Sequence, residues 1–139
     1  MEIIISQNQD APHVSIMQLR GALDGNSYGY FITEAEKLFD AGVRNLLLDV
    51  SELNFLSSAG LAALHRIARI FRGEDRSILE EGWSAIYAMG RERDSGFQEH
   101  VKLLNPSENV QGVLDTAGFK AFFEIYTEID RAIASFQIT

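Results

Sequence analysis

The spacing of hydrophobic positions predicts two strands and a helix at the start of the chain. Two stretches rich in β-branched residues, 3–7 and 13–20, are typical of strands, and a polar turn at 8–12 joins them. An antiparallel hairpin is the simplest arrangement, with alternate residues of the second strand facing opposite sides of the sheet. The residues after position 20 break the strand pattern and offer Asn26 or Ser27 as the N-cap of a helix.

The middle of the chain changes from a helical pattern to a strand pattern and back. Apolar residues recur at steps of three and four over 28–41, which predicts a helix that ends at Gly42. The short apolar run at 43–50 follows that helix directly and indicates a buried parallel strand. We expect residues 51–56 to form a loop with apolar anchors and a second helix to begin around Ser57.

The C-terminal part repeats this alternation. We expect a short strand at 101–104, a helix at about 108–117 that stops at Gly118, a last strand at 119–126 and a final helix capped by Thr127. The predicted order is β-β-α-β-α-β-α-β-α. Such an order implies an α/β fold with a mixed, mostly parallel sheet and helices packed against it.

One connection is much longer than those between neighbouring elements of most α/β domains. We interpret residues 73–100 as an inserted helical segment, because Leu79, Trp83, Ile86 and Tyr87 fall on one helical face. This helix is expected either to cover part of the sheet or to form an interface through Trp83 and Tyr87, since both residue types are common at interface hot spots.

Composition narrows the possible functions. The 139 residues include no cysteine, which excludes a disulfide framework, a thiolate metal site and a cysteine nucleophile. A net charge of −8 disfavours direct binding to nucleic acid or to an anionic membrane. We expect one soluble, cytoplasmic domain over 1–139, with no membrane partner, since no apolar stretch approaches the ~20 residues of a membrane span.

Catalytic patterns do not stand out. His13, His65 and His100 are isolated from one another, and the chain has no Walker or dinucleotide loop and no Gly-x-Ser-x-Gly elbow. We therefore expect a non-enzymatic protein with no metal and no cofactor.

The segment Leu56-Ser57-Ser58-Ala59-Gly60-Leu61 is the sharpest local feature. Two hydroxyls fall at a predicted helix start, beside free backbone N–H groups and the positive end of the helix dipole. A structural interpretation makes Ser57 the N-cap, Ser58 a first-turn residue, and Ala59 and Gly60 small for close packing. A functional interpretation makes the segment a phosphorylation switch, because a phosphate adds about −1.5 to −2 charges at that point.

Several motifs in order resemble those of STAS domains, the fold of bacterial anti-sigma factor antagonists. They are Arg20-Gly21-Ala22-Leu23-Asp24, Leu46-Leu47-Leu48-Asp49-Val50-Ser51, Phe55 to Leu61, Val101-Lys102-Leu103-Leu104-Asn105-Pro106 and Ala117-Gly118-Phe119. The resemblance covers about 3–72 and 101–136, which leaves out most of the long connection.

This resemblance implies a partner-switching regulator. Family members bind an anti-sigma factor, usually a serine kinase with a histidine-kinase-like ATPase fold, and a phosphatase reverses the phosphorylation. The phosphorylated serine maps onto Ser58, and Asp24 matches an acidic position near the same surface. The expected partner-binding residues are Asp24, Asn26, Ser57, Ser58, Ala59 and Gly60.

The chain departs from the family pattern at Ser57, where the family has aspartate. Serine keeps the capping oxygen but loses the charge, so either Ser57 or Ser58 could accept the phosphate. An adaptor or scaffold subunit of a regulatory or transport complex, without phosphorylation, is the alternative function. A small hydrolase using Asp24, Asp49 and the two serines is a third, and a homo-oligomer is possible in each case.

Overall fold

A computed structural model describes residues 1–9, 11–74 and 98–136 of the chain. Within them, six strands form one sheet in the order β1-β2-β3-β5-β6, with β4 paired to β2 beyond this path. The strands are β1 (Glu2–Asn8), β2 (Ala11–Leu23), β3 (Leu46–Asp49), β4 (Leu53–Leu56), β5 (Val101–Leu104) and β6 (Ile125–Tyr126). The helices are α1 (Tyr28–Asp40), α2 (Ser58–Phe71), α4 (Glu108–Ala117), α5 (Ile129–Ser135) and the 3-10 helix η3 (Phe119–Ala121).

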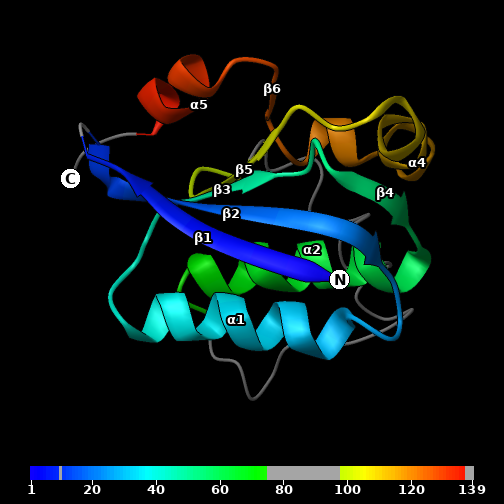
Figure 1. Cartoon of the computed structure of the whole chain (residues 1–139), viewed down its shortest axis with the longest axis horizontal. Coiled ribbons are helices and arrows are strands. Elements are labelled where there is room, and N and C mark those ends of the chain that lie inside the picture. The colour runs from blue at the N-terminus through cyan, green and yellow to red at the C-terminus, as the bar shows by residue number, and fades with distance from the viewer. Residues whose placement is uncertain (10, 75–97, 137–139) are drawn as a thin grey trace.

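The sheet lies between two unequal layers of helices. Helices α1 and α2 lie side by side on one face and α5 lies on the other (Figure 1). Strand β2 contributes to both layers, because Met17 and Leu19 belong to the larger core and Val14 and Ile16 to the smaller one under α5. The mixed α/β fold and the predicted alternation along this strand are therefore confirmed.

Pairing in the sheet follows the predicted topology. Strands β1 and β2 form an antiparallel hairpin, whereas β2, β3, β5 and β6 run parallel. The helix at 28–41 is confirmed as α1, and Gly42 follows it with a φ of 104°. That backbone conformation suits glycine and ends the helix.

The predictions around the first loop were wrong in three places. The turn between β1 and β2 is shorter than 8–12, since Asn8 pairs with Ala11. Strand β2 continues to Leu23, and the expected loop at 51–56 contains β4, which pairs with it in parallel. Because two exposed residues separate the buried Leu53 and Leu56, β4 lacks the alternation that reveals a strand.

The prediction of a last strand over 119–126 was also wrong. The structure has η3 first, and β6 contains only Ile125 and Tyr126. Phe119, Phe122 and Phe123 are buried and form a cluster, with ring centroids 4.9–6.0 Å apart. Their spacing of three and four residues is helical, which agrees with the 3-10 helix and not with a strand.

Of the two predicted caps, one position is confirmed and the other is wrong. Ser27 is the N-cap residue of α1, although its hydroxyl donates to the carbonyl of Ala22 and does not cap the helix. Helix α5 begins after Glu128 and not after Thr127, and no side chain caps it. The expected helix with Trp83 and Tyr87 lies outside the described residues.

In the part of the chain that the structure describes, no helix has the length and apolar character needed to cross a membrane.

Candidate functional site

The candidate site lies where β2 and β4 end. Leu23 pairs with Leu56, so the residues that follow each strand leave the sheet at the same place. The backbone N–H of Ser57 donates to the carbonyl of Leu23 over 3.1 Å. The extended β2 and the short β4 thus bring the Asp24 loop next to the start of α2, which the sequence motifs did not establish by themselves.

The start of α2 is built around Ser57. This residue is the N-cap in an extended conformation, and its hydroxyl oxygen accepts a hydrogen bond from the N–H of Gly60 at 3.2 Å. Ser58 is the first residue of the helix and its side chain is exposed. The predicted capping arrangement is confirmed, with one hydroxyl used by the helix and the other facing outward.

Gly60 allows α2 to approach the sheet closely. A Cβ atom at this position would lie 2.4 Å from the carbonyl oxygen of Leu23 and 2.7 Å from Cδ1 of Leu56. Both distances are too short for any side chain. Gly60 therefore fixes the distance between the helix start and the ends of β2 and β4, as the structural interpretation of this segment expected.

The Asp24 loop is held by hydrogen bonds within the loop. One carboxylate oxygen of Asp24 accepts from the backbone N–H groups of Asn26 and Ser27, at 2.9 and 3.2 Å. The Ser27 hydroxyl oxygen accepts from the N–H of Asp24 at 3.0 Å. Asn26 is exposed beside this turn. Asp24 therefore adds negative charge near the site while it shapes the loop.

Helix α4 forms the other side of the site. The Ser107 hydroxyl donates to the carbonyl of Leu53, and the Asn109 side-chain amide donates to the carbonyl of Asn54, at 3.2 and 3.0 Å. These bonds attach the start of α4 to β4. Sequence patterns gave no signal for either contact, because β4 itself was not predicted.

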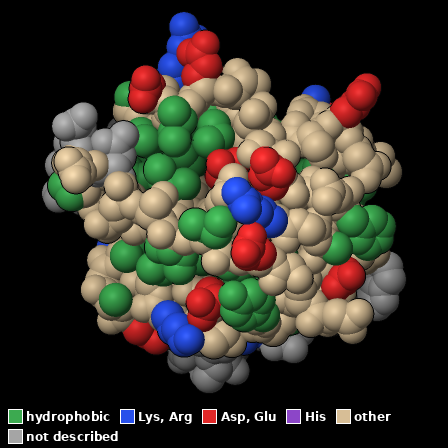
Figure 2. All heavy atoms as spheres, in the orientation of Figure 1, with side chains coloured by type: hydrophobic (Ala, Val, Ile, Leu, Met, Phe, Trp, Pro, Cys, Tyr) green, Lys and Arg blue, Asp and Glu red, His purple; other side chains and the backbone are tan. Residues whose placement is uncertain are grey.

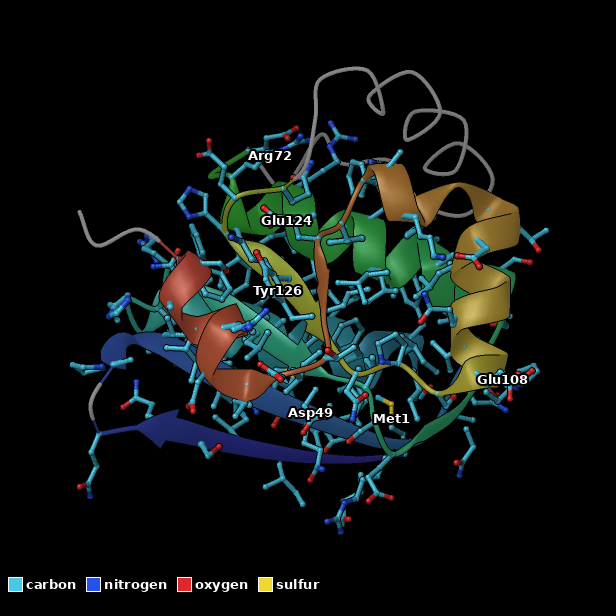
Figure 3. The ribbon with its side chains drawn as sticks, turned by 90° about the horizontal axis from the view of Figure 1, so that it is seen from above. Met1, Asp49, Arg72, Glu108, Glu124 and Tyr126 are labelled. Atoms are coloured by element: carbon cyan, nitrogen blue, oxygen red, sulfur yellow. The ribbon has the colours of Figure 1, made fainter. Side chains whose placement is uncertain are left out.

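A groove of about 530 Å³ lies between the start of α2 and α4. It is lined by Leu61, Glu108, Asn109, Gly112, Val113, Thr116 and Ala117. Glu108 is the one charged group among these lining residues, and it lies exposed at the first turn of α4 (Figure 3). On β4, Phe55 is 49% exposed. The groove therefore carries negative charge, and an exposed aromatic residue lies on the strand to which α4 is attached.

The carboxylate of Asp49, which the hydrolase alternative would use, is hydrogen-bonded within its own loop. Asp49 accepts from both the backbone N–H and the hydroxyl of Ser51, at 3.0 and 2.7 Å. His65 is buried in α2 against the ring of Phe122. Among the described residues, no carboxylate or imidazole is bonded to the hydroxyl of Ser57 or Ser58.

The titrating groups with resolved shifts lie elsewhere. Burial and a hydrogen bond to Glu124 raise the pKa of Tyr126, which lies beside α5 (Figure 3). Burial raises the pKa of Glu74, which follows α2. The hydrogen bonds from Arg69 and Arg72 to its carboxylate outweigh this effect and hold the pKa of Glu74 below the ordinary value. Neither group belongs to the candidate site.

Comparison with known proteins identifies related sequences and structures. A family model described as "Mlab, STAS domain" matches residues 6–87, more than half of the chain. No curated protein sequence matches. A solved structure from Thermotoga maritima, assigned as an anti-sigma factor antagonist, has a TM-score of 0.69 and 16% identity and covers 95% of this chain and 92% of its own.

Two further structures have the same arrangement. An anti-sigma factor antagonist from Mycobacterium paratuberculosis has a TM-score of 0.67 and 14% identity, covering 96% of this chain and 92% of its own. Phosphorylated SpoIIAA, a Bacillus cell fate determinant, has a TM-score of 0.59 and 16% identity, and the match covers 96% of this chain and 97% of its own. At such identities these matches show a common fold.

Proposed function

Because this chain belongs to the STAS domain family, we propose that it is a non-enzymatic regulator that binds an anti-sigma factor through the surface around Ser58. Phosphorylation of Ser58 by a serine kinase weakens this binding, and a phosphatase restores it. The anti-sigma factor and the kinase are the same protein in this proposal.

The observation that carries the proposal is that the two serines have different positions and different hydrogen bonding. The Ser57 hydroxyl is held as the N-cap of α2, whereas Ser58 is exposed on the first turn. A kinase needs an accessible hydroxyl, so Ser58 is the acceptor and Ser57 supports the helix. This also explains how serine can replace aspartate at position 57 without loss of the capping oxygen.

The surroundings of Ser58 favour a switch that depends on phosphorylation. The first-turn N–H groups and the helix dipole stabilise a phosphate at this position. A basic partner surface would pair with Asp24 and Glu108 around the unmodified serine. A bulky dianion on Ser58 occupies the contact itself, so it disrupts binding by steric exclusion and desolvation more than by its effect on the net charge.

Phosphate mapping tests the acceptor. The protein is incubated with its cognate kinase and ATP, and the modified residue is identified by mass spectrometry. We expect the label on Ser58, retained in Ser57→Ala and absent in Ser58→Ala. No label on either serine would contradict the proposal.

An affinity measurement tests the switch. Ser58→Asp is expected to lose binding to the anti-sigma factor, while Thr33→Asp keeps it, because this control adds the same charge at an exposed position of α1. Equal binding by wild type and Ser58→Asp would favour the second candidate function, an adaptor subunit that binds without phosphorylation. The missing acidic group at position 57 is the observation that favours this second candidate.

A further inference from the structure

Strand β1 leaves one edge of the sheet open. It is the terminal strand in the sheet order and pairs only with β2 among the described strands. Figure 2 views the molecule from this edge, and hydrophobic side chains gather on this face between α5 and α1. An open edge presents backbone N–H and C=O groups that can pair with another strand.

The composition of β1 does not protect this edge. Natural edge strands are often guarded by lysine, proline or a central bulge. Strand β1 has the sequence EIIISQN, and its one irregularity lies at its end, between Gln7 and Asn8. Ile4 and Ile5 are 40% and 42% exposed, and because alternate residues face opposite ways they lie on both faces of the edge.

We propose that β1 is a self-association surface, on which β1 of a second copy of this chain adds as an antiparallel strand about a two-fold axis at Ile4. In this register Ile4 faces Ile4 of the second copy, and Ile3 faces its Ile5. Glu2 faces Ser6 of the second copy, so a carboxylate meets a hydroxyl donor. Antiparallel isologous pairing is self-complementary by symmetry.

Charge and side-chain pairing favour a second copy and this register. Glu2 is the one charged residue of β1 and already pairs with Arg20 at 3.3 Å, so two copies meet without facing like charges despite the net charge of each chain. An axis at Ile5 would instead place Ile3 opposite Gln7, whose side-chain amide is bound to Ser15. The Ile4 axis pairs every isoleucine with another isoleucine.

The size of the interface sets its strength. In this register residues 2–6 of the two copies face one another, a span of about 17 Å. A single pair of strand edges of this length is expected to bury less than the ~1,200 Å² of a stable interface, which corresponds to a transient dimer. The association therefore needs measurement up to a concentration of about 1 mM.

The first test uses sedimentation equilibrium of the full chain. Wild type is expected to show a reversible monomer–dimer equilibrium, and Ile4→Lys to remain monomeric because two ammonium groups would face each other at the axis. Ile129→Lys is the matched control, since Ile129 is 43% exposed on α5, and should dimerise like wild type. A wild type that stays monomeric at about 1 mM, or a dimer unaffected by Ile4→Lys, would overturn the proposal.

The second test addresses the register with changes at an exposed position. Ser6→Lys places an ammonium group opposite Glu2 of the second copy and should lower the dimer dissociation constant about 2- to 30-fold, from two cross-strand ion pairs. Ser6→Glu should raise it by a similar factor. If both substitutions change the dissociation constant in the same direction, the proposed pairing of Glu2 with Ser6 is wrong.

Two controls apply to all of these variants. Circular dichroism checks that each variant is folded, and binding to the anti-sigma factor through Ser58 is measured separately.

Discussion

At the residue scale, Gly60 and Ser57 determine how the candidate site is held. Gly60 brings α2 against the backbone of β2, and Ser57 provides both an N–H for Leu23 and an oxygen for the first turn. The sequence motif predicted the cap and the need for a small residue. It did not predict that the contact would be with the carbonyl of Leu23, because that depends on where β2 ends.

Gly60→Ala is expected to lower the free energy of unfolding by about 1–3 kcal/mol or more, since a Cβ atom would overlap backbone and Leu56. Gly29→Ala is the control in the first turn of α1, where nothing lies within 4 Å of an added Cβ. It should be neutral or stabilise by up to about 1 kcal/mol. Urea denaturation of both variants measures the difference, and equal effects would contradict the packing account.

Glu74 should make stability depend on pH on the acidic side. Its pKa is lowered from 4.5 by Arg69 and Arg72, despite burial, so the folded state favours the ionised carboxylate. The stabilisation is therefore present above pH 4.5 and is lost as the pH falls through the folded-state pKa. We expect wild type to be more stable than Glu74→Gln at neutral pH, and this difference to shrink in acid. A difference independent of pH would show that the ion pairs are not its cause.

At the element scale, segments with a clear hydrophobic pattern were predictable and segments without one were not. Helices α1, α2 and α4 and strand β5 follow their patterns closely. Strands β4 and β6 form because neighbouring strands offer them backbone partners. Only the two end residues of β4 are buried and β6 has two residues, so neither shows the pattern of a strand. For the same reason the sequence did not predict Phe55 and Asn109 near the candidate site, because Phe55 lies on β4 and Asn109 is bonded to it.

Helix α5 is a second element that the pattern of hydrophobic residues explains only in part. Lys102 is buried under it, and its ammonium donates to the carbonyl and hydroxyl of Ser135 at 3.1 and 3.0 Å. It also lies 3.5 Å from Glu124 and 4.8 Å from the ring centroid of Phe136. A lysine in a short buried strand thus anchors the last helix.

Lys102→Ala is expected to lower the free energy of unfolding by about 1–3 kcal/mol, because the acceptors on α5 lose their donor. Hydrogen exchange should also become faster over 129–135. Lys120→Ala removes an exposed lysine paired with Asp115, and should change stability by no more than about 1 kcal/mol. If α5 exchanges equally in both variants, Lys102 does not anchor it.

At the scale of the whole molecule, the net charge of −8 gains a specific meaning from the surface around Ser58. Asp24 and Glu108 lie on that surface, and the groove between α2 and α4 has no Lys or Arg among its lining residues. An acidic composition by itself fits either a basic protein partner or solubility. The arrangement of these carboxylates favours the basic partner, and it depends on tertiary contacts that no composition reveals.

The association rate with the anti-sigma factor should therefore fall about 3- to 10-fold when salt is raised from low to physiological concentration, because opposite charges steer the encounter. Glu108→Gln should reduce this dependence. Glu128→Gln, at a 65% exposed side chain near α5, should change it less. Stopped-flow measurements give the rates, and a salt-independent rate would contradict the electrostatic account.

The contact between Gly60 and Leu23 has a mechanical consequence. The start of α2 rests directly on backbone, so a group attached to Ser58 has a stiff support behind it. A modification there changes what an approaching protein meets, while the interior stays as it was. A partner would then detect the phosphate by direct contact, and its removal would restore the original surface without any rearrangement of the fold.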